Sequence, residues 1–222
     1  MAGGSGQRFG ARKQFLPLAG SPVAAWAVRA ARASNDGVVL VVPAAADPSA
    51  DGPSAGLPVP GTGPDDAWGA DAVVAGGATR AGSVRAGLAA VPAGAAVVVV
   101  HDAARPLAAP ALFDAVVESV RAGAAGAVPG VPVADTLKQV AGDHVVATVD
   151  REALVAVQTP QAFDAAALRA VHAAGDEATD DAGLLEAAGL AVVVVPGDPR
   201  NLKVTRPEDL ALAEALLAGA AR

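Results

Sequence analysis

The chain has 222 residues, which suffices for one sizeable hydrophobic core and predicts a single domain over 1–222. Its net charge of −7 argues against nucleic acid as a partner, and the absence of cysteine excludes disulfides, thiolate metal sites and a cysteine nucleophile. Apolar runs are shorter than a membrane span and the first residues lack a signal-peptide layout, so we expect a cytoplasmic protein with no membrane partner.

The chain opens on a glycine-rich segment, MAGGSGQRFG, which contains Arg8 and is followed closely by Lys13. Closely spaced glycines let backbone N–H groups approach phosphate oxygens, and the two cations add positive charge. The segment is not a P-loop, and Phe9 at the third glycine position departs from the dinucleotide fingerprint. Such a loop normally follows a strand, but only Met1 and Ala2 precede the glycines. We therefore expect either that the first strand of the sheet is missing or truncated, or that the protein starts upstream of Met1.

Apolar runs and helix signals alternate along the rest of the chain. This alternation predicts a doubly wound α/β domain with a mostly parallel, Rossmann-like sheet. The segment 43–69 is rich in Pro, Gly, Ala, Ser and Asp, and is expected to be a long surface excursion without chemistry. The predicted strands span 38–42, 71–75, 97–100, 124–133 and 190–195, and the predicted helices span 23–33, 79–91, 110–123, 164–174 and 179–189, with a last helix from 207.

Three of the predicted helices begin with capping residues. A hydroxyl N-cap at Ser21, with proline next to it, predicts the start of the first helix. Asp164 is expected to cap the helix that follows it. Thr205 and Glu208 have the spacing of a capping box for the last helix.

Four consecutive valines, 97–100, run directly into His101, Asp102 and Arg105. Continuous hydrophobicity indicates a strand buried on both faces of a sheet. Ligands bind beyond the carboxyl ends of such strands, so an acid and a base at this point favour a site. In the alternative interpretation Asp102 caps the next turn and Arg105 is a solvated loop charge. We assign no chemistry to His101 or His172, and expect His172 on a helix surface.

Two short strand-like runs, 137–141 and 144–149, are joined by a Gly-Asp turn. They predict a β-hairpin arm over about 132–156 that projects from the domain. Arms of this kind often mediate dimerisation, so we expect a homodimer. Arg151 lies where the arm returns to the domain.

Most of the cations of interest fall at loops or element ends, with Asp102 as the main acid among them. Gathered in one crevice, they would suit a polyphosphate with a bound divalent cation and a second phosphorylated substrate. The cations are Arg8, Lys13, Arg80, Arg105, Arg151 and Lys203.

Nine segments in chain order resemble the 2-C-methyl-D-erythritol 4-phosphate cytidylyltransferases of the non-mevalonate isoprenoid pathway. They are AGGSGQRFG, KQFLPLAGSPV, GGATRAGSV, VHDAARP, PVADTLK, TVDR, QTPQAF, TDDAGLLE and NLKVTRPEDL. The resemblance implies that an acceptor phosphate oxygen attacks the α-phosphorus of CTP and expels pyrophosphate, while Mg²⁺ bridges phosphate oxygens.

The resemblance also implies a role for each matching residue. Catalytic roles fall on Arg8, Lys13, Arg151 and Lys203. Nucleotide contacts fall on Ala2, Gly3, Gly4, Gly77, Ser83 and Ala103. Contacts with the acceptor substrate fall on Asp102, Arg105, Thr136, Thr159 and Thr179, with Asp102 also a metal ligand. Thr136 and Arg151, carried by the arm, would reach the active site of a partner subunit.

Three other functions stay open from the sequence. A cytidylyltransferase for another polyol phosphate, such as ribitol 5-phosphate, would share the nucleotide half of the site. A catalytically dead dimer that still binds nucleotide is the second. A nicotinamide-binding Rossmann protein is the third, and Phe9 together with the missing ribose-binding acid disfavours it.

Overall fold

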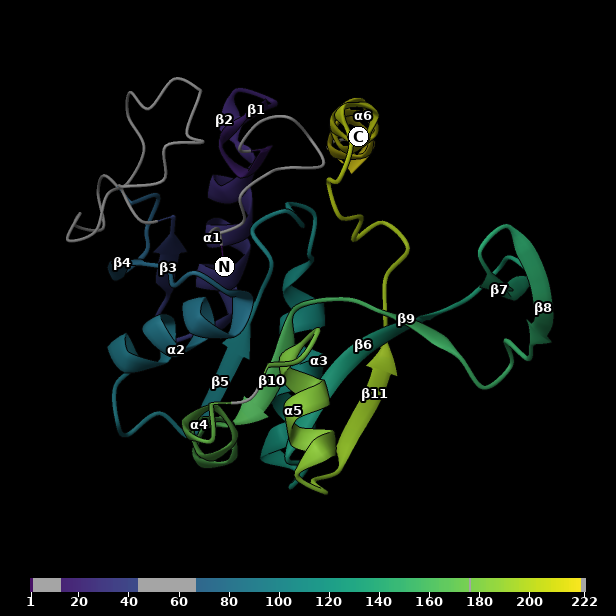
Figure 1. Ribbon diagram of the computed structural model, residues 1–222. Coiled ribbons are helices and arrows are strands. Elements are labelled where there is room, and N and C mark those ends of the chain that lie inside the picture. Colours follow the sequence, from purple (N-terminus) through teal and green to yellow (C-terminus); the bar gives the residue numbers. More distant parts are fainter. Residues whose placement is uncertain (2–12, 44–66, 176, 221–222) are drawn as a thin grey trace.

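The computed structural model describes residue 1 and the ranges 13–43, 67–175 and 177–220 (Figure 1). Strands and helices alternate through most of this length, as expected for an α/β fold. The helical elements are η1 (Lys13–Phe15), α1 (Val23–Ser34), α2 (Arg80–Ala90), α3 (Pro110–Arg121), α4 (Ala165–Ala173), α5 (Asp181–Ala187) and α6 (Pro207–Ala220). The strands are β1 (Pro17–Leu18), β2 (Ser21–Pro22), β3 (Val39–Val42), β4 (Ala72–Ala75), β5 (Val97–Val100), β6 (Gly126–Pro132), β7 (Leu137–Ala141), β8 (His144–Val149), β9 (Val155–Val157), β10 (Gln161–Asp164) and β11 (Val192–Pro196).

The main sheet has the strand order β11-β6-β10-β5, and β9 pairs antiparallel with the last residues of β6, from Gly130↔Val157 to Pro132↔Val155. β11 runs parallel to β6, whereas β10 lies antiparallel between β6 and β5. The sheet, predicted to be mostly parallel, is therefore mixed. β10 was not among the predicted strands, because Gln161 and Asp164 flank only two apolar residues. Its pairing with β5 and β6 makes it a strand.

A second, two-stranded sheet consists of β3 and β4, which pair in parallel from Val39↔Ala72 to Val42↔Ala75. Within the described part of the chain, no ladder joins β3 to β5. β3 and β5 nevertheless run in the same direction (Figure 1). The order of the elements is thus that of a doubly wound sheet interrupted at one position.

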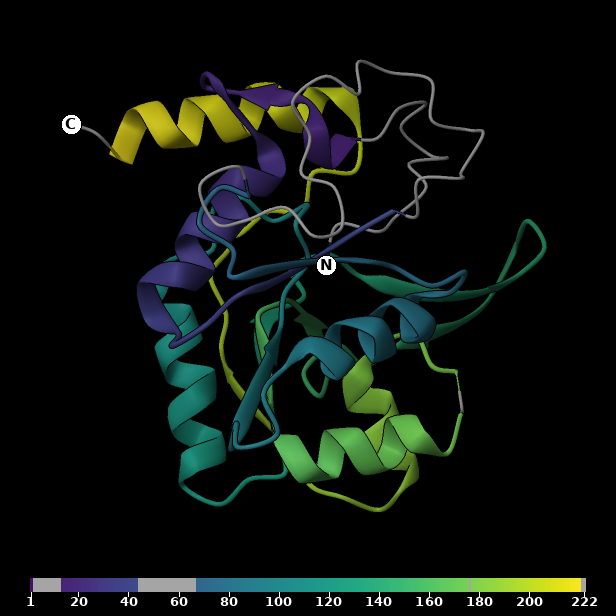
Figure 2. The ribbon, with the colours of Figure 1, turned by 90° about the vertical axis from the view of Figure 1, so that its left-hand side faces the viewer.

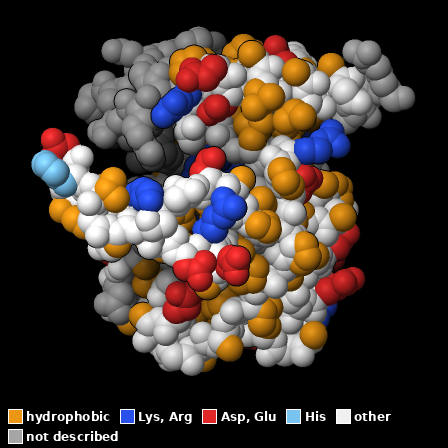
Figure 3. Space-filling model, turned by 90° about the vertical axis from the view of Figure 1, so that its right-hand side faces the viewer, with side chains coloured by type: hydrophobic (Ala, Val, Ile, Leu, Met, Phe, Trp, Pro, Cys, Tyr) orange, Lys and Arg blue, Asp and Glu red, His pale blue; other side chains and the backbone are white. Residues whose placement is uncertain are grey.

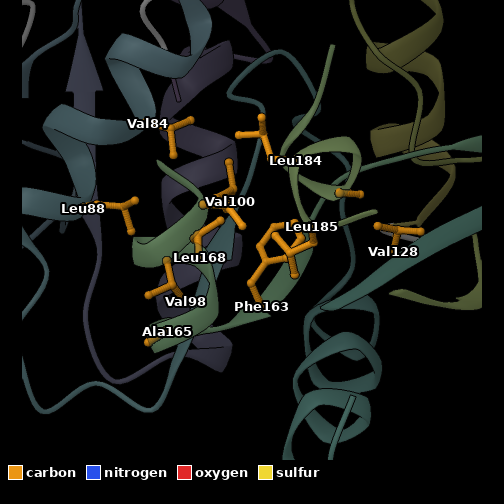
Figure 4. Packing of buried hydrophobic residues seen from close by; sticks show 12 residues of the cluster. Val84, Leu88, Val98, Val100, Val128, Phe163, Ala165, Leu168, Leu184 and Leu185 are labelled. Atoms are coloured by element: carbon orange, nitrogen blue, oxygen red, sulfur yellow. The ribbon is translucent and has the colours of Figure 1, made fainter. Parts of the chain in front are cut away.

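The valines of β5 face both layers of helices. Val98 and Val100 belong to a core cluster with α2, α4 and α5, in which Phe163 and Leu185 are fully buried (Figure 4). Val97 and Val99 pack against the opposite cluster, formed with α3. The prediction that this strand is covered on both faces is confirmed. Its predicted central, parallel position is not, because in the described part of the chain β5 lies at the end of the sheet order and pairs antiparallel with β10. The carboxyl end of β5 carries His101 and Asp102.

Two of the three predicted caps differ from expectation. The N-cap of α1 is Pro22, which makes no side-chain capping hydrogen bond. Ser21, the predicted cap, lies one residue earlier in β2. At α6 the carboxylate of Asp209, rather than that of Glu208, accepts hydrogen bonds from Thr205 N (2.6 Å) and Thr205 Oγ1 (2.8 Å). The Asp164 cap is confirmed, because its carboxylate accepts from Ala167 N at 2.8 Å.

β7 and β8 form the predicted antiparallel hairpin, with a register shift between Gln139 and Val140. The hairpin projects from the side of the sheet, and α6 lies at another end of the molecule against β1 and α1 (Figures 1 and 2). Every residue of β8 is exposed. The arm is therefore a surface feature that does not pack into the cores of this chain.

Candidate active site

The carboxyl end of β5 is organised by a hydrogen-bonded relay through His101. The His101 Nε2 lies 3.1 Å from the carbonyl oxygen of Arg105, which can only accept, so Nε2 carries the proton. The hydroxyl of Thr159 can then donate to Nδ1 at 3.1 Å, while its oxygen accepts from Asp102 N at 3.0 Å. Burial lowers the pKa of His101 to about 4, so the ring is neutral at pH 7. His101 and Thr159 therefore fix the backbone that presents Asp102.

Asp102 forms an ion pair with Lys203, with 2.6 Å between Oδ2 and Nζ. Burial acts to raise the pKa of Asp102, but the charge and hydrogen bond of Lys203 outweigh it and lower that pKa to about 2. The carboxylate is thus ionised at pH 7. Lys203 keeps 43% of its side chain exposed against 20% for Asp102, so the ammonium stays open to an anionic ligand.

A buried network places Lys203 opposite the tip of β5. Asn201 is completely buried, and its Nδ2 donates to the carbonyl oxygen of Thr159 at 2.9 Å and to Gln158 Oε1 at 3.2 Å. Val204 N donates to the carbonyl oxygen of Ala104 at 2.8 Å. These bonds hold the segment that carries Lys203 against the loop after β5.

Arg105 is part of the same assembly. Its Nη1 donates to the carbonyl oxygen of Asn201 at 2.7 Å. Burial lowers the pKa of the guanidinium, and the charge of Asp102 opposes that shift. The interpretation of Arg105 as a solvated loop charge is therefore wrong, because this guanidinium is partly buried and connects the two site segments.

A second charged network lies between α2, α4 and α5. Asp181 is completely buried and accepts from Arg80 Nη2 at 2.7 Å and pairs with His172 Nε2 at 2.9 Å. Burial acts to raise the pKa of Asp181, and the hydrogen bonds of His172 and Arg80 outweigh it and lower that pKa. Arg80 and Asp102 also interact electrostatically, so the two networks lie near one another.

His172 was expected on a helix surface, and that expectation was wrong. The residue is 3% exposed and packs inward from α4. A signal for this was present, because His172 follows the core residue Leu168 by one helical turn and so shares its face. From the sequence, Asp181 was expected only to lie near the start of the helix predicted over 179–189.

The glycine pair after β4 forms a tight corner against the start of α2. A Cβ on Gly77 would lie 2.8 Å from the backbone carbon of Gly82, so the close approach requires glycine. The side chain of Thr79 caps α2 by accepting from Gly82 N at 3.0 Å. Ser83 is buried, and its hydroxyl donates to the carbonyl oxygen of Thr79 at 2.9 Å. Ser83 thus supports this corner from inside.

The remaining predicted site residues lie in several places. Ala2, Gly3, Gly4 and Arg8 fall outside the described residues, as does the side chain of Lys13. Ala103 is buried, and its N–H donates to the carbonyl oxygen of Met1 at 2.9 Å. Thr179 is exposed just before α5. Thr136 and Arg151 lie at the base of the arm, where the guanidinium of Arg151 donates to the carbonyl oxygen of Ala134.

The donor set around Asp102 fits a loosely held magnesium ion. In the ranges that the structure covers, no group of three or more Asp, Glu, His or Cys side chains could form a protein cage for a metal. Mg²⁺ commonly uses one or two carboxylates together with substrate phosphates and water. Asp102 supplies one such ionised carboxylate.

Comparison with known proteins gives one consistent result. Residues 1–219 match the family model described as 2-C-methyl-D-erythritol 4-phosphate cytidylyltransferase. The enzyme of that name from Streptomyces coelicolor is 47% identical over 227 residues, covering 98% of this chain and 83% of the relative. The one from Synechococcus elongatus is 44% identical over 223 residues, covering 97% and 93%. The crystal structure of the Thermus thermophilus enzyme matches with a TM-score of 0.76 and 37% identity, covering 95% of this chain and 96% of that one.

The α/β fold, with charged groups gathered at the ends of β5 and β4, is that of a nucleotidyltransferase. Within the described part of the chain, no helix has the length and apolar character needed to cross a bilayer. The chain belongs to the 2-C-methyl-D-erythritol 4-phosphate cytidylyltransferase family.

Proposed function

We propose that this cytidylyltransferase transfers the cytidylyl group of CTP to 2-C-methyl-D-erythritol 4-phosphate and releases pyrophosphate. The observation that carries this proposal is the Asp102–Lys203 pair, held at the end of β5 beside Arg105. A partly exposed ammonium there can bind a phosphate, and the family relationship indicates which phosphates are meant. The bond between the α- and β-phosphates of CTP breaks as the acceptor phosphate oxygen bonds to the α-phosphorus.

Each described residue has a defined part in this reaction. Lys203 stabilises negative charge on the phosphoryl groups, because an aimed cation in a partly desolvated site is worth far more than one in water. Asp102 and Arg105 orient Lys203 and contact the acceptor. The corner at Gly77 lets the nucleotide approach the backbone closely, and no general base is needed because the attacking phosphate is already anionic.

Arg8 and Lys13 complete the proposed charge set by holding the triphosphate. Asp102 would hold the magnesium ion, with the triphosphate supplying most of its other oxygen ligands. When bound, that ion neutralises charge on the phosphate oxygens. The role of this chain is to keep the carboxylate ionised, which the ion pair with Lys203 achieves.

A two-acceptor assay tests the proposal and separates its rivals. Purified protein is given CTP and Mg²⁺ with either 2-C-methyl-D-erythritol 4-phosphate or ribitol 5-phosphate, and pyrophosphate release is measured. We expect release with the first acceptor only. Release only with ribitol 5-phosphate would assign the second substrate. CTP binding by calorimetry without turnover on either acceptor would indicate a catalytically inactive nucleotide-binding protein.

The arm is proposed to join two copies of the chain into a homodimer. Its valines are exposed on both strands of the hairpin: Val140 of β7 and Val145 and Val146 of β8 are each more than half exposed. This side of the molecule, with the arm extending to one edge, is seen in Figure 3. Exposed apolar side chains of this kind are usual at interaction surfaces. Thr136 and Arg151 would then enter the partner's active site.

Mixing two inactive variants tests that arrangement. Arg151→Ala and Lys203→Ala are each expected to be nearly inactive. In a hybrid dimer one site combines an intact Lys203 with an intact Arg151 from the other subunit, so random mixing restores about a quarter of the wild-type activity. No recovery, although light scattering detects hybrid dimers, would mean that Arg151 acts within its own subunit.

A further inference from the structure

Trp68 adopts a backbone conformation that is unusual for a bulky residue. It is the first central residue of a turn closed by a hydrogen bond of 3.0 Å from Ala70 N to the carbonyl oxygen of Ala67. Its φ is 58°, and the φ of Gly69, the second central residue, is 95°. Two positive φ values in succession are the mark of a type I′ turn, in which Gly, Asn or Asp normally occupies these positions. A tryptophan there is strained, so another contact must keep it in place.

The turn is anchored at both of its ends. Ala67 and Ala70 are completely buried, and both belong to a core cluster that includes Leu40 of β3. The side chains of Trp68 and Phe15 are partly buried and pack against the same cluster. Because both ends of the turn are fixed in the core, the side chain of Trp68 starts from a fixed point.

The contact that Trp68 makes is with Phe15. The two ring centroids are 6.5 Å apart and the ring planes are inclined at 47°, within the range of favourable aromatic pairs. Phe15 is the last residue of η1, and Lys13 is the first. The next residue, Leu16, accepts a hydrogen bond of 3.0 Å from Val23 N at the start of α1. The end of η1 is therefore held by two contacts, one with Trp68 and one with α1.

The same core cluster reaches the loop that follows β5. Ala103, which comes directly after Asp102, is 3% exposed and belongs to this cluster. Protein interiors are close-packed and transmit small displacements. Since Phe15 and Ala103 share one cluster, the ring of Trp68 contributes to the distance between η1 and the loop that carries Asp102. A misplacement of about 1 Å between reacting groups can lower a rate on the order of a hundredfold.

We propose that Trp68 is a positioning residue, whose ring holds Phe15 and thereby sets where the segment that carries Lys13 lies relative to Asp102. The inference rests on the proposed function, in which Lys13 holds the triphosphate of CTP. Trp68 itself touches no substrate, because it acts through Phe15 and η1. This role explains why a tryptophan occupies a turn position to which asparagine or glycine is better suited.

Five variants test the role of Trp68. Trp68→Asn removes the ring and suits the turn, so the fold should be retained. Trp68→Phe keeps an aromatic ring facing Phe15. Phe15→Leu removes the other half of the contact, and it is made alone and together with Trp68→Asn. Leu88→Ala creates a cavity in the separate core cluster beneath α2, and it controls for loss of stability alone. CTP affinity is measured by calorimetry, together with kcat, the KM of each substrate and the melting temperature.

We expect Trp68→Asn to weaken CTP binding at least about tenfold and to lower kcat/KM for CTP by at least as much, with the KM of the acceptor unchanged. Phe15→Leu should have the same effects, and the double variant should bind CTP no more weakly than the weaker single variant, because both changes remove one contact. Trp68→Phe should stay within about threefold of the wild-type affinity. Leu88→Ala should lower the melting temperature and leave CTP affinity unchanged.

Wild-type CTP affinity and turnover in Trp68→Asn would overturn the proposal. So would effects of Trp68→Asn and Phe15→Leu that multiply in the double variant, or an equal loss of CTP affinity in Leu88→Ala. Failure of the proposed function gives a different result. If the wild-type protein binds CTP without turnover, the reaction is rejected, and the calorimetric comparison of the variants still decides the role of Trp68. If the wild-type protein does not bind CTP, both proposals fail.

Discussion

Replacing Lys203 by methionine tests the central feature of the site, because the change removes the charge and keeps most of the side-chain volume. In the wild-type protein the pKa of Asp102 is about 2, against an ordinary value of 3.8. Such a pKa difference means that the folded protein favours the ionised form of Asp102 by about 2.5 kcal/mol. Lys203 is 43% exposed, and solvent screening reduces its share, so we expect Lys203→Met to lower the free energy of unfolding by about 1–2 kcal/mol at pH 7.

The pH dependence gives the sign of the effect. A carboxylate whose pKa is lowered in the folded state contributes stability above its ordinary pKa, and that contribution disappears as the pH falls through about 2. In the variant, burial of Asp102 is no longer opposed by Lys203, so its pKa rises. Urea unfolding should therefore separate the two proteins at pH 7 and bring them together as the pH approaches 2.

Activity should fall much further than stability. Loss of one cation aimed at developing charge typically lowers the catalytic rate about a hundredfold or more. The fall in kcat/KM should therefore correspond to at least about 2 kcal/mol of lost transition-state stabilisation. Arg32→Met is the matched control, since Arg32 forms an ion pair of 2.7 Å with Asp71 in which both side chains are about half exposed. Arg32→Met should lower the free energy of unfolding by less than about 1 kcal/mol and leave turnover unchanged. Wild-type turnover in Lys203→Met, with CTP and the acceptor present, would refute the assignment.

Further predictions concern the supports of the site. Gly77→Ala should lower the free energy of unfolding by about 2 kcal/mol and weaken CTP binding in calorimetry, because the added Cβ would meet the backbone of Gly82. Gly94→Ala is the control and should leave both unchanged, because a Cβ there meets nothing within 4 Å. Thr159→Val should lower the free energy of unfolding, measured in urea, by about 1–3 kcal/mol, because it leaves His101 Nδ1 without its hydrogen-bond donor. Thr159→Ser keeps the hydroxyl and should retain most of that stability. Equal losses in the two variants would argue against the relay. Asp181→Asn should lower the free energy of unfolding by at least about 2 kcal/mol at pH 7. Because the pKa of Asp181 is lowered, that deficit should shrink as the pH falls below about 4, and a deficit independent of pH would contradict the buried charge.

Local patterns in the sequence were sufficient for most individual elements. The four valines of β5 predicted a strand buried on both faces, and Val97 to Val100 do alternate between two cores. The hairpin at 137–149 was recognisable because its turn residues and its alternating strands are adjacent in sequence. Caps were less predictable, since Asp209 and Glu208 are neighbours and only the path of the chain decides which carboxylate reaches Thr205.

The α/β class, a strand at 97–100 covered on both faces, the arm and, through its ordered motifs, the family could all be predicted from the amino-acid sequence. These features depend on residues close together in the chain, so periodicity and spacing are enough to identify them. The three-dimensional fold was needed to show that Lys203 meets Asp102, that Asp181 joins His172 to Arg80, and that β10 is a strand. Those pairings bring together segments far apart in sequence, and their geometry follows from how β5, β10 and the helices pack around one another.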